Sequence, residues 1–128
     1  MDVLLDTHIL VWAWTGDKRL TPAQRDLLAA SEVRPRVSIV SMWEIAIKSS
    51  LGKLELNAPL EELAASFPEF HLDLLPLRLE HVHAVKALPF HHRDPFDRML
   101  IAQAKQEDMH LLTADPLFRA YDVPLIGG

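Results

Sequence analysis

Short apolar runs recur along the chain and alternate with stretches whose apolar residues have helical spacing. We predict strands from the runs at residues 3–5, 37–40, 72–75, 110–113 and 123–126. The run Val3-Leu4-Leu5 is typical of a parallel strand that is buried on both faces. Arg34-Pro35-Arg36 is interpreted as a loop between elements.

Helices are predicted between these strands from cap residues and apolar spacing. Their expected ranges are 8–14, 23–31, 41–51, a helix that Pro59 opens, 79–88, 95–107 and a brief helix from 116. Thr21-Pro22 and Asp94-Pro95 are helix-start signals, because a polar cap precedes a proline in the first turn. We expect Ser41 to cap the third helix. The apolar residues at every third position from Leu79 to Leu88 form a helical stripe.

The alternation of strands and helices predicts a single α/β domain over residues 1–128. Its central sheet is expected to be mainly parallel and flanked by helices in three layers. In such sheets, ligands bind beyond the carboxyl ends of the strands. Candidate chemistry is therefore sought at that edge.

Four acidic residues are candidates for that edge. Asp6 follows the first strand directly, Glu44 lies one turn into the helix after the second, and Asp115 comes just after the fourth. In a parallel sheet these three side chains fall at the same edge. Asp97 lies in the first turn of the preceding helix and reaches the edge only if that helix begins there.

These acids also have ordinary structural explanations. Ser41-x-x-Glu44 has the form of a capping box, and Asp115 before Pro116 is a good N-cap. Asp94-x-x-Asp97 places negative charge in a first helical turn, where the helix dipole favours it. Glu44 and Lys48 form an i,i+4 pair that is common on solvated helix faces. Taken singly, each acid is more often a cap or a surface group.

Two features favour a metal site. Asp97 aligns with Leu100 and Ile101 on its helix, and Glu44 aligns with Ile47, so both carboxylates lie beside apolar residues. A carboxylate in such a place must be paired, protonated or bound to a cation. The sequence near Asp6 offers no Arg or Lys, and four converging carboxylates would repel one another. A divalent ion removes that conflict, and oxygen ligands suit Mg²⁺ or Mn²⁺.

Composition narrows the function classes. The chain has no Cys, which excludes disulfides and thiolate zinc sites and suits a cytoplasmic location. Acidic residues outnumber basic ones 18 to 13, so the chain has no net positive charge with which to bind nucleic acid. A bound metal could still contact a phosphate. No run of about 20 apolar residues predicts a membrane span. The first residues lack the basic region of a secretory signal.

Five segments together resemble the ordered motifs of PIN-domain proteins, most closely the VapC-type toxins of bacterial toxin–antitoxin pairs. The segments are Asp6-Thr7-His8, Ser41-x-x-Glu44, Gly52-Lys53-Leu54, the run from His92 to Ala104, and Thr113-Ala114-Asp115. The resemblance covers nearly the whole chain and implies a PIN-like fold and an endoribonuclease that depends on Mg²⁺ or Mn²⁺. It also implies a homodimer, and inhibition by a cognate antitoxin whose C-terminal segment fills the toxin's groove.

The family's acidic quartet falls on Asp6, Glu44, Asp97 and Asp115, and Asp94 is a plausible accessory acid whose capping role is favoured. Our hypothesis is that Asp6 and Asp97 hold the first metal and that Asp115 completes its shell or helps to hold a second ion. Glu44 would orient the attacking water or share the second metal.

Basic and aromatic residues offer weaker signals. Three cations, Lys48, Arg93 and Arg98, are candidates for phosphate contacts, with solvated surface charges at least as frequent an explanation. Three tryptophans, Trp12, Trp14 and Trp43, are candidate base-stacking platforms, but core or dimer interface is favoured for them. For His8 we favour packing over a substrate contact. The seven histidines show no zinc-ligand spacing.

Two rival functions remain open. One is a receiver-like signalling domain, in which an acid near a bound Mg²⁺ accepts a phosphoryl group. It is disfavoured because Asp6 has no acidic neighbour at its strand end. The other is a catalytically silent PIN-fold adaptor. It is disfavoured because such an adaptor would not need all four acids. Neither a G-x-S-x-G elbow nor a phosphate-binding P-loop occurs.

Overall fold

Five strands form one sheet in the computed structural model, which describes residues 1–127. The strands are β1 (Asp2–Leu5), β2 (Arg34–Ser38), β3 (Asp73–Leu75), β4 (His110–Leu112) and β5 (Leu125–Ile126). Their order in the sheet is β3-β2-β1-β4-β5, and each neighbouring pair is parallel. The predicted α/β fold with a parallel sheet is confirmed.

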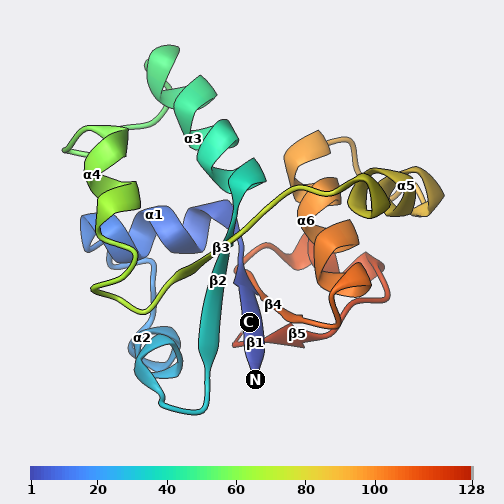
Figure 1. Cartoon of the computed structure of the whole chain (residues 1–128), viewed down its shortest axis with the longest axis horizontal. Helices are drawn as coiled ribbons and strands as arrows, with labels where there is room; N and C mark the ends of the chain where they lie inside the picture. Colours follow the sequence, from blue (N-terminus) through green and yellow to red (C-terminus); the bar gives the residue numbers. More distant parts are fainter. Residues whose placement is uncertain (128) are drawn as a thin grey trace.

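Helices cover both faces of this sheet. They are α1 (Thr7–Thr15), α2 (Pro22–Ala29), α3 (Ile39–Ser50), α4 (Leu60–Ala65), α5 (Leu79–Ala87) and α6 (Pro95–Gln106), with a 3₁₀ helix, η1 (Pro116–Ala120), between β4 and β5. Figure 1 shows α1, α2 and α4 on one side of the sheet and α5 and α6 on the other, which gives three layers. Helix α3 continues from the end of β2 and contacts both α1 and α6. No helix within residues 1–127 is long and apolar enough to cross a membrane.

The central strand β1 is buried on both faces, as its apolar run predicts. Val3 and Leu5 belong to the core beneath α1, α2 and α4. Leu4, between them, packs into a second core with Leu100 and Ile101 of α6. Because successive side chains of a strand point to opposite faces, β1 joins the two cores and fixes where its C-terminal end lies.

The start of β2 corrects one sequence interpretation, because Arg34-Pro35-Arg36 is strand and not loop. The Arg34 N–H bonds to the Met1 carbonyl on the β1 side at 2.7 Å. In a parallel strand the next residue faces the other neighbour, and β3 pairs with β2 only from Arg36 onward. Pro35 therefore lacks an N–H where the sheet needs no donor, and the strand tolerates it.

The start of α3 is a second correction, because its N-cap is Ser38 and not Ser41. The Ser38 hydroxyl accepts a hydrogen bond from the Val40 N–H at 3.0 Å. Ser41 is instead buried in the first turn, where its hydroxyl accepts a 2.9 Å bond from the Thr7 hydroxyl. Ser41 and Glu44 thus form no capping box.

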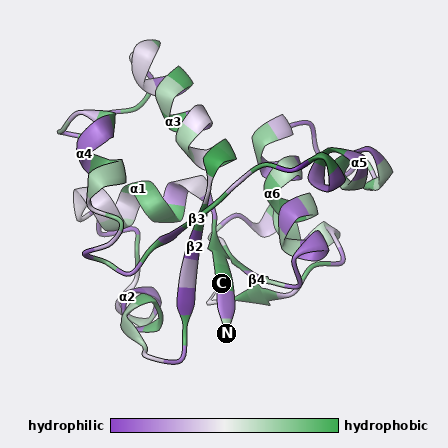
Figure 2. Cartoon of the chain, in the orientation of Figure 1, coloured by the Kyte–Doolittle hydropathy of each residue, from purple (hydrophilic) through white to green (hydrophobic). Residues whose placement is uncertain are grey.

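Helix α5 shows a third difference, because the first half of its apolar stripe is exposed. Leu79 and Val82 are 66% and 43% exposed, whereas His81 is fully buried. The His81 ring accepts a 3.0 Å bond from the Arg78 N–H at Nδ1 and lies 2.9 Å from Glu107 through Nε2. Hydrogen bonding to α6 therefore decides which side of α5 faces inward. Figure 2 shows apolar segments of α5 at the periphery of the molecule.

Candidate active site

Asp6 lies at the C-terminal end of β1, where its carboxylate is buried and hydrogen-bonded on both oxygens. Oδ1 accepts from the His8 N–H at 3.2 Å and so caps α1. Oδ2 accepts from the Thr113 hydroxyl at 2.6 Å. The second bond turns the carboxylate toward the end of β4.

Thr113 connects Asp6 to Asp115. Its hydroxyl also accepts a 3.0 Å hydrogen bond from the Asp115 N–H. The Asp115 side chain accepts from the Leu117 N–H at 2.9 Å through Oδ1, which caps η1 as the sequence predicts. Capping occupies one carboxylate oxygen of Asp115 and leaves the other for a further ligand.

Glu44 projects from the second turn of α3, and only 2% of its side chain is exposed. Oε2 accepts a 2.5 Å hydrogen bond from the Lys48 ammonium, which confirms the i,i+4 pair. The pair is not on a solvated face, however, because Glu44 is buried. Oε1 is also buried and has no hydrogen-bond partner within residues 1–127. A buried carboxylate oxygen without a partner is costly unless a cation or a water meets it.

Asp97 lies in the first turn of α6, which begins at the same edge of the sheet. The helix is capped by Asp94, whose Oδ1 accepts from the Phe96 and Asp97 N–H groups at 2.9 and 3.0 Å. The Asp97 side chain is 14% exposed, and its Oδ2 lies 3.5 Å from Nε2 of His92. Asp97 is thus held against the protein and cannot turn freely into solvent.

The electrostatics of Asp97 reflect the negative charge of the acids around it. Burial raises its pKa from 3.8 to about 8, and the negative charges of four other carboxylates add to this rise. Those carboxylates, in order of effect, belong to Asp6, Asp94, Glu44 and Asp115. Near neutral pH the Asp97 carboxyl therefore keeps its proton unless a cation compensates the surrounding charge.

Asp6 is perturbed in the same direction. Burial raises its pKa and the charge of Glu44 adds to the rise, whereas the Thr113 hydrogen bond and the nearby His8 oppose it. Within residues 1–127, no three His, Asp or Glu side chains already lie at metal-binding spacing.

The basic and aromatic candidates have different outcomes. Arg98 is buried, and its guanidinium donates to the Pro89 carbonyl at 2.8 Å and to the Tyr121 hydroxyl at 3.2 Å, so it is neither a phosphate contact nor a surface charge. His8 packs only in part: its ring centroid lies 6.0 Å from that of Trp12, and 58% of the side chain is exposed 3.9 Å from Asp6. Trp43 is 59% exposed and so does not belong to the monomer core.

Sequence reasoning missed several side chains that orient the acids. The hydroxyl of Thr113 and the ring of His92 contact two of the acids directly. Both stand within the quoted motifs, Thr113 two positions before Asp115 and His92 five before Asp97, yet nothing in the spacing specified their partners. Tyr121, which contacts His92, lies outside those motifs, and no sequence signal pointed to it.

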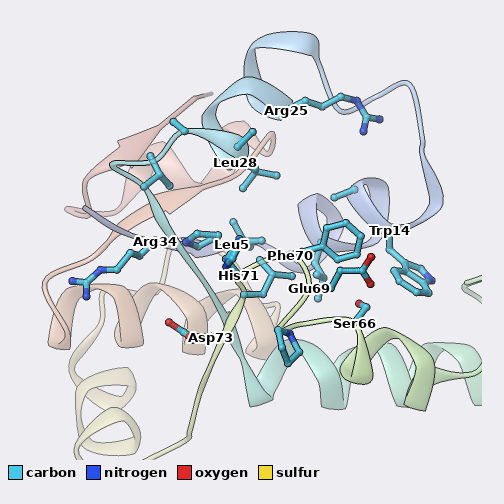
Figure 3. A pocket seen from close by; sticks show the side chains of 18 of the residues that line it. Leu5, Trp14, Arg25, Leu28, Arg34, Ser66, Glu69, Phe70, His71 and Asp73 are labelled. Atoms are coloured by element: carbon cyan, nitrogen blue, oxygen red, sulfur yellow. The ribbon is translucent and has the colours of Figure 1, made fainter.

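A cavity of about 1060 Å³ lies elsewhere (Figure 3). It is lined by residues of α1 and α2, by the start of β2 and by the segment 66–73, including Trp14, Arg25, Leu28, Arg34 and Phe70. None of the four predicted acids lines it. The acidic cluster at the sheet edge therefore lies apart from this cavity.

Comparison with known proteins agrees with this fold. The family model for the PIN domain matches residues 3–124. VapBC2 from Rickettsia felis, solved with a DNA fragment from its promoter, is 16% identical with a TM-score of 0.71, over 98% of this chain and 96% of that one. No curated protein matches the sequence.

Two further solved structures are similar. FitAcB from Neisseria gonorrhoeae is 19% identical with a TM-score of 0.64, over 96% of this chain and 95% of that one. VapBC-1 from nontypeable Haemophilus influenzae is 16% identical with a TM-score of 0.65, over 98% and 96%. At these identities the likeness establishes a shared fold.

Proposed function

The chain belongs to the PIN domain family, whose members are typically nucleases, and from this premise we propose that it is a metal-dependent endoribonuclease. The proposed site consists of Asp6, Glu44, Asp97 and Asp115. The observation that carries the proposal is the concentration of negative charge around Asp97, to which carboxylates from separate segments contribute. Such a concentration is typical of a site built for a cation.

The chain's own residues fit a hard divalent ion. The donors are carboxylate oxygens, which Mg²⁺ and Mn²⁺ prefer. Glu44 offers a buried oxygen that meets no donor within residues 1–127, and the protonation of Asp97 at neutral pH would give way to a bound cation. We assign Asp6, Asp97 and Asp115 as the residues that hold the metal.

Each acid then has a distinct role. Bound Mg²⁺ or Mn²⁺ would polarise the scissile phosphate and lower the pKa of an attacking water. Asp6 is fixed by Thr113 and His8, so it presents a preorganised carboxylate. Lys48 holds Oε2 of Glu44, which leaves Oε1 to orient the water or to share a second ion.

RNA cleavage in the presence and absence of Mn²⁺ tests this function. We expect the wild-type chain to cleave single-stranded RNA with Mn²⁺ and to lose activity in chelator. Asp6→Asn and Asp97→Asn should each reduce the rate by 100-fold or more, because each removes a metal ligand. Asp26→Asn, which changes an exposed acid on α2, is the matched control. Cleavage that persists in chelator, or in folded Asp97→Asn, would refute the metal-dependent site, and no cleavage by the folded wild-type chain with Mn²⁺ would leave the silent adaptor.

We further propose that the chain is the toxin of a toxin–antitoxin pair, acts as a homodimer and blocks translation by cleaving RNA. The support is that this chain shares its fold, over nearly its whole length, with the VapBC and FitAB toxin–antitoxin structures. Expression should arrest growth, and Asp97→Asn should relieve the arrest at equal protein level. Continued growth of cells that contain active wild-type protein would contradict the toxin assignment.

A further inference from the structure

The Tyr121 hydroxyl is the centre of a buried hydrogen-bond group next to the acidic site. Tyr121, which follows η1, is 5% exposed. Its oxygen lies 3.0 Å from Nδ1 of His92, 3.2 Å from the His92 N–H and 3.3 Å from the His91 N–H. Nη1 of Arg98 lies 3.2 Å from the same oxygen.

These partners determine which nitrogen of His92 carries the proton. Backbone N–H groups and a guanidinium can only donate, so the donors of His91, His92 and Arg98 share the acceptor lone pairs of the Tyr121 oxygen. The phenol proton is then directed to Nδ1 of His92, which must accept it. In the neutral ring the remaining proton therefore sits on Nε2.

The protonated nitrogen faces the acidic cluster. Nε2 of His92 lies 3.5 Å from Oδ2 of Asp97. It is buried and has no hydrogen-bond partner within residues 1–127. A small shift of the Asp97 carboxylate would bring the two atoms within hydrogen-bond range. A neutral His92 with this tautomer donates at Nε2 and cannot act there as a general base.

Arg98 fixes the ring relative to the helix that carries Asp97. Arg98 adjoins Asp97 on α6, and its guanidinium donates to the carbonyls of Pro89 and Val85 at 2.8 and 3.3 Å. The segment that leads to His92 is therefore anchored to the same first turn of α6.

We propose that His92, oriented by Tyr121, is a positioning residue that holds Oδ2 of Asp97 and leaves Oδ1 to meet the divalent cation. The proposal rests on the proposed function in that it takes the acidic cluster as the metal site. Outer partners that orient a carboxylate ligand typically change metal affinity or activity by about 10–100-fold when they are removed.

Two amide variants separate the roles of the two ring nitrogens of His92. His92→Asn places an amide near the position of Nδ1 and keeps the Tyr121 contact, but it removes the donor to Asp97. His92→Gln places an amide N–H near the position of Nε2 and restores that donor. His83→Asn, at an exposed histidine on α5, is the control.

Mn²⁺ binding measured by calorimetry is the first readout. We expect His92→Asn to weaken Mn²⁺ binding by about 10–100-fold, His92→Gln to recover most of the loss, and His83→Asn to match wild type. On RNA, His92→Asn should lower kcat and leave KM nearly unchanged, because the ring does not contact the substrate. Wild-type Mn²⁺ affinity in folded His92→Asn, or equal losses in both amide variants, would overturn the proposal.

Nitrogen NMR of the His92 ring in the metal-free protein is the second readout. At pH 8 the spectrum should show a protonated Nε2 and a bare Nδ1. Tyr121→Phe should mix the tautomers, and Asp97→Asn should shift the Nε2–H resonance. A proton on Nδ1, or no response to Asp97→Asn, would overturn the proposal. If wild type binds no Mn²⁺, the metal-nuclease function fails, while these spectra still decide whether His92 holds Asp97.

Discussion

At the scale of single residues, burial rather than spacing gives the acids their character. Asp6 and Glu44 are nearly inaccessible, and Asp97 is close to that condition. A carboxylate in such surroundings keeps its charge only if something compensates it. Lys48 does so for one oxygen of Glu44, and Thr113 contributes a neutral hydrogen bond to Asp6. Asp97 has no comparably close donor, and its pKa rises from 3.8 to about 8.

The stability of the metal-free protein should therefore fall as pH rises. The pKa of Asp97 is about 8 in the folded chain against 3.8 ordinarily, so between about pH 4 and 8 the folded state holds a proton that the unfolded state has lost. Asp97→Asn should weaken this dependence and raise the free energy of unfolding at pH 8 by roughly 1–2 kcal/mol after allowance for solvent screening. Part of the pH dependence of the free energy of unfolding should remain in Asp97→Asn, because the pKa of Asp6 is also raised.

Urea unfolding in chelator between pH 5 and 9 measures this effect. The wild-type and Asp97→Asn curves should diverge as pH rises, with Asp26→Asn following wild type. Parallel curves for wild type and Asp97→Asn would show that the Asp97 carboxyl is not protonated in the folded chain.

Thr113→Val isolates the hydroxyl that joins Asp6 to Asp115. The variant keeps the side-chain shape but removes a donor to Asp6 and an acceptor for the Asp115 N–H. We expect a loss of about 1–3 kcal/mol in the free energy of unfolding, together with weaker Mn²⁺ binding. The control is Thr15→Val, which removes a bond to the Val11 carbonyl within α1. Equal Mn²⁺ affinity for the two valine variants would show that the Thr113 hydroxyl does not contribute to Mn²⁺ binding.

Sequence reasoning anticipated the acids better than their partners. Asp6 and Asp115 directly follow strands, and the edge rule places such residues without any knowledge of side-chain contacts. The partners depend on rotamers and on segments far apart in the chain. Nothing in the composition indicates that Arg98 bonds to carbonyls or that Tyr121 meets His92.

At the scale of elements, a buried polar group overrides an apolar stripe in α5. Gln103 of α6 bonds to the Ser38 hydroxyl through Oε1 and lies 3.3 Å from Nδ1 of His81 through Nε2. His81 thus belongs to a network that connects α5, α6 and the cap of α3. Apolar periodicity finds such a helix but not its buried side, because it counts hydrophobic area and ignores hydrogen bonds. For the same reason, the sequence interpretation assigned the start of β2 to a loop, because a local pattern does not show which strands lie beside it.

His81→Ala should destabilise the protein far more than the same change at a neighbouring histidine. The substitution leaves a cavity and leaves the Arg78 N–H and the Glu107 carboxylate without their His81 partner. We therefore expect a loss of about 2–4 kcal/mol in the free energy of unfolding. His83→Ala, on the exposed side of α5, should cost within about 0.5 kcal/mol. Chemical denaturation compares the two, and similar losses would contradict the buried, hydrogen-bonded position of His81.

At the scale of the whole molecule, strand order brings the candidate site together. β1 is central and β2 and β4 are its neighbours, so the residues after these three strands share one edge. The alternation of elements predicted parallel strands, but the order β3-β2-β1-β4-β5 follows from packing that no local pattern reveals. The helices of both faces contribute as well, since Glu44 comes from α3 and Asp97 from α6.

A metal that binds across these segments should stabilise the whole fold. Binding to the folded state alone adds about 2.7 kcal/mol when the ligand exceeds its Kd by 100-fold. Thermal unfolding should therefore show a Tm that rises with Mn²⁺ concentration for wild type and for Asp26→Asn. Asp6→Asn should show little rise, because it lacks a ligand. A Tm that Mn²⁺ leaves unchanged would count against a metal site in the native protein.

The hydrogen bond between Thr113 and Asp6 joins residues that are 107 positions apart, near opposite ends of the chain. During synthesis, Asp6 leaves the ribosome long before Thr113 has been added. The acidic cluster consequently cannot assemble on a growing polypeptide before Thr113 and Asp115 have been added. A ribonuclease built in this manner would stay harmless to the message that encodes it until the ribosome had passed these two codons.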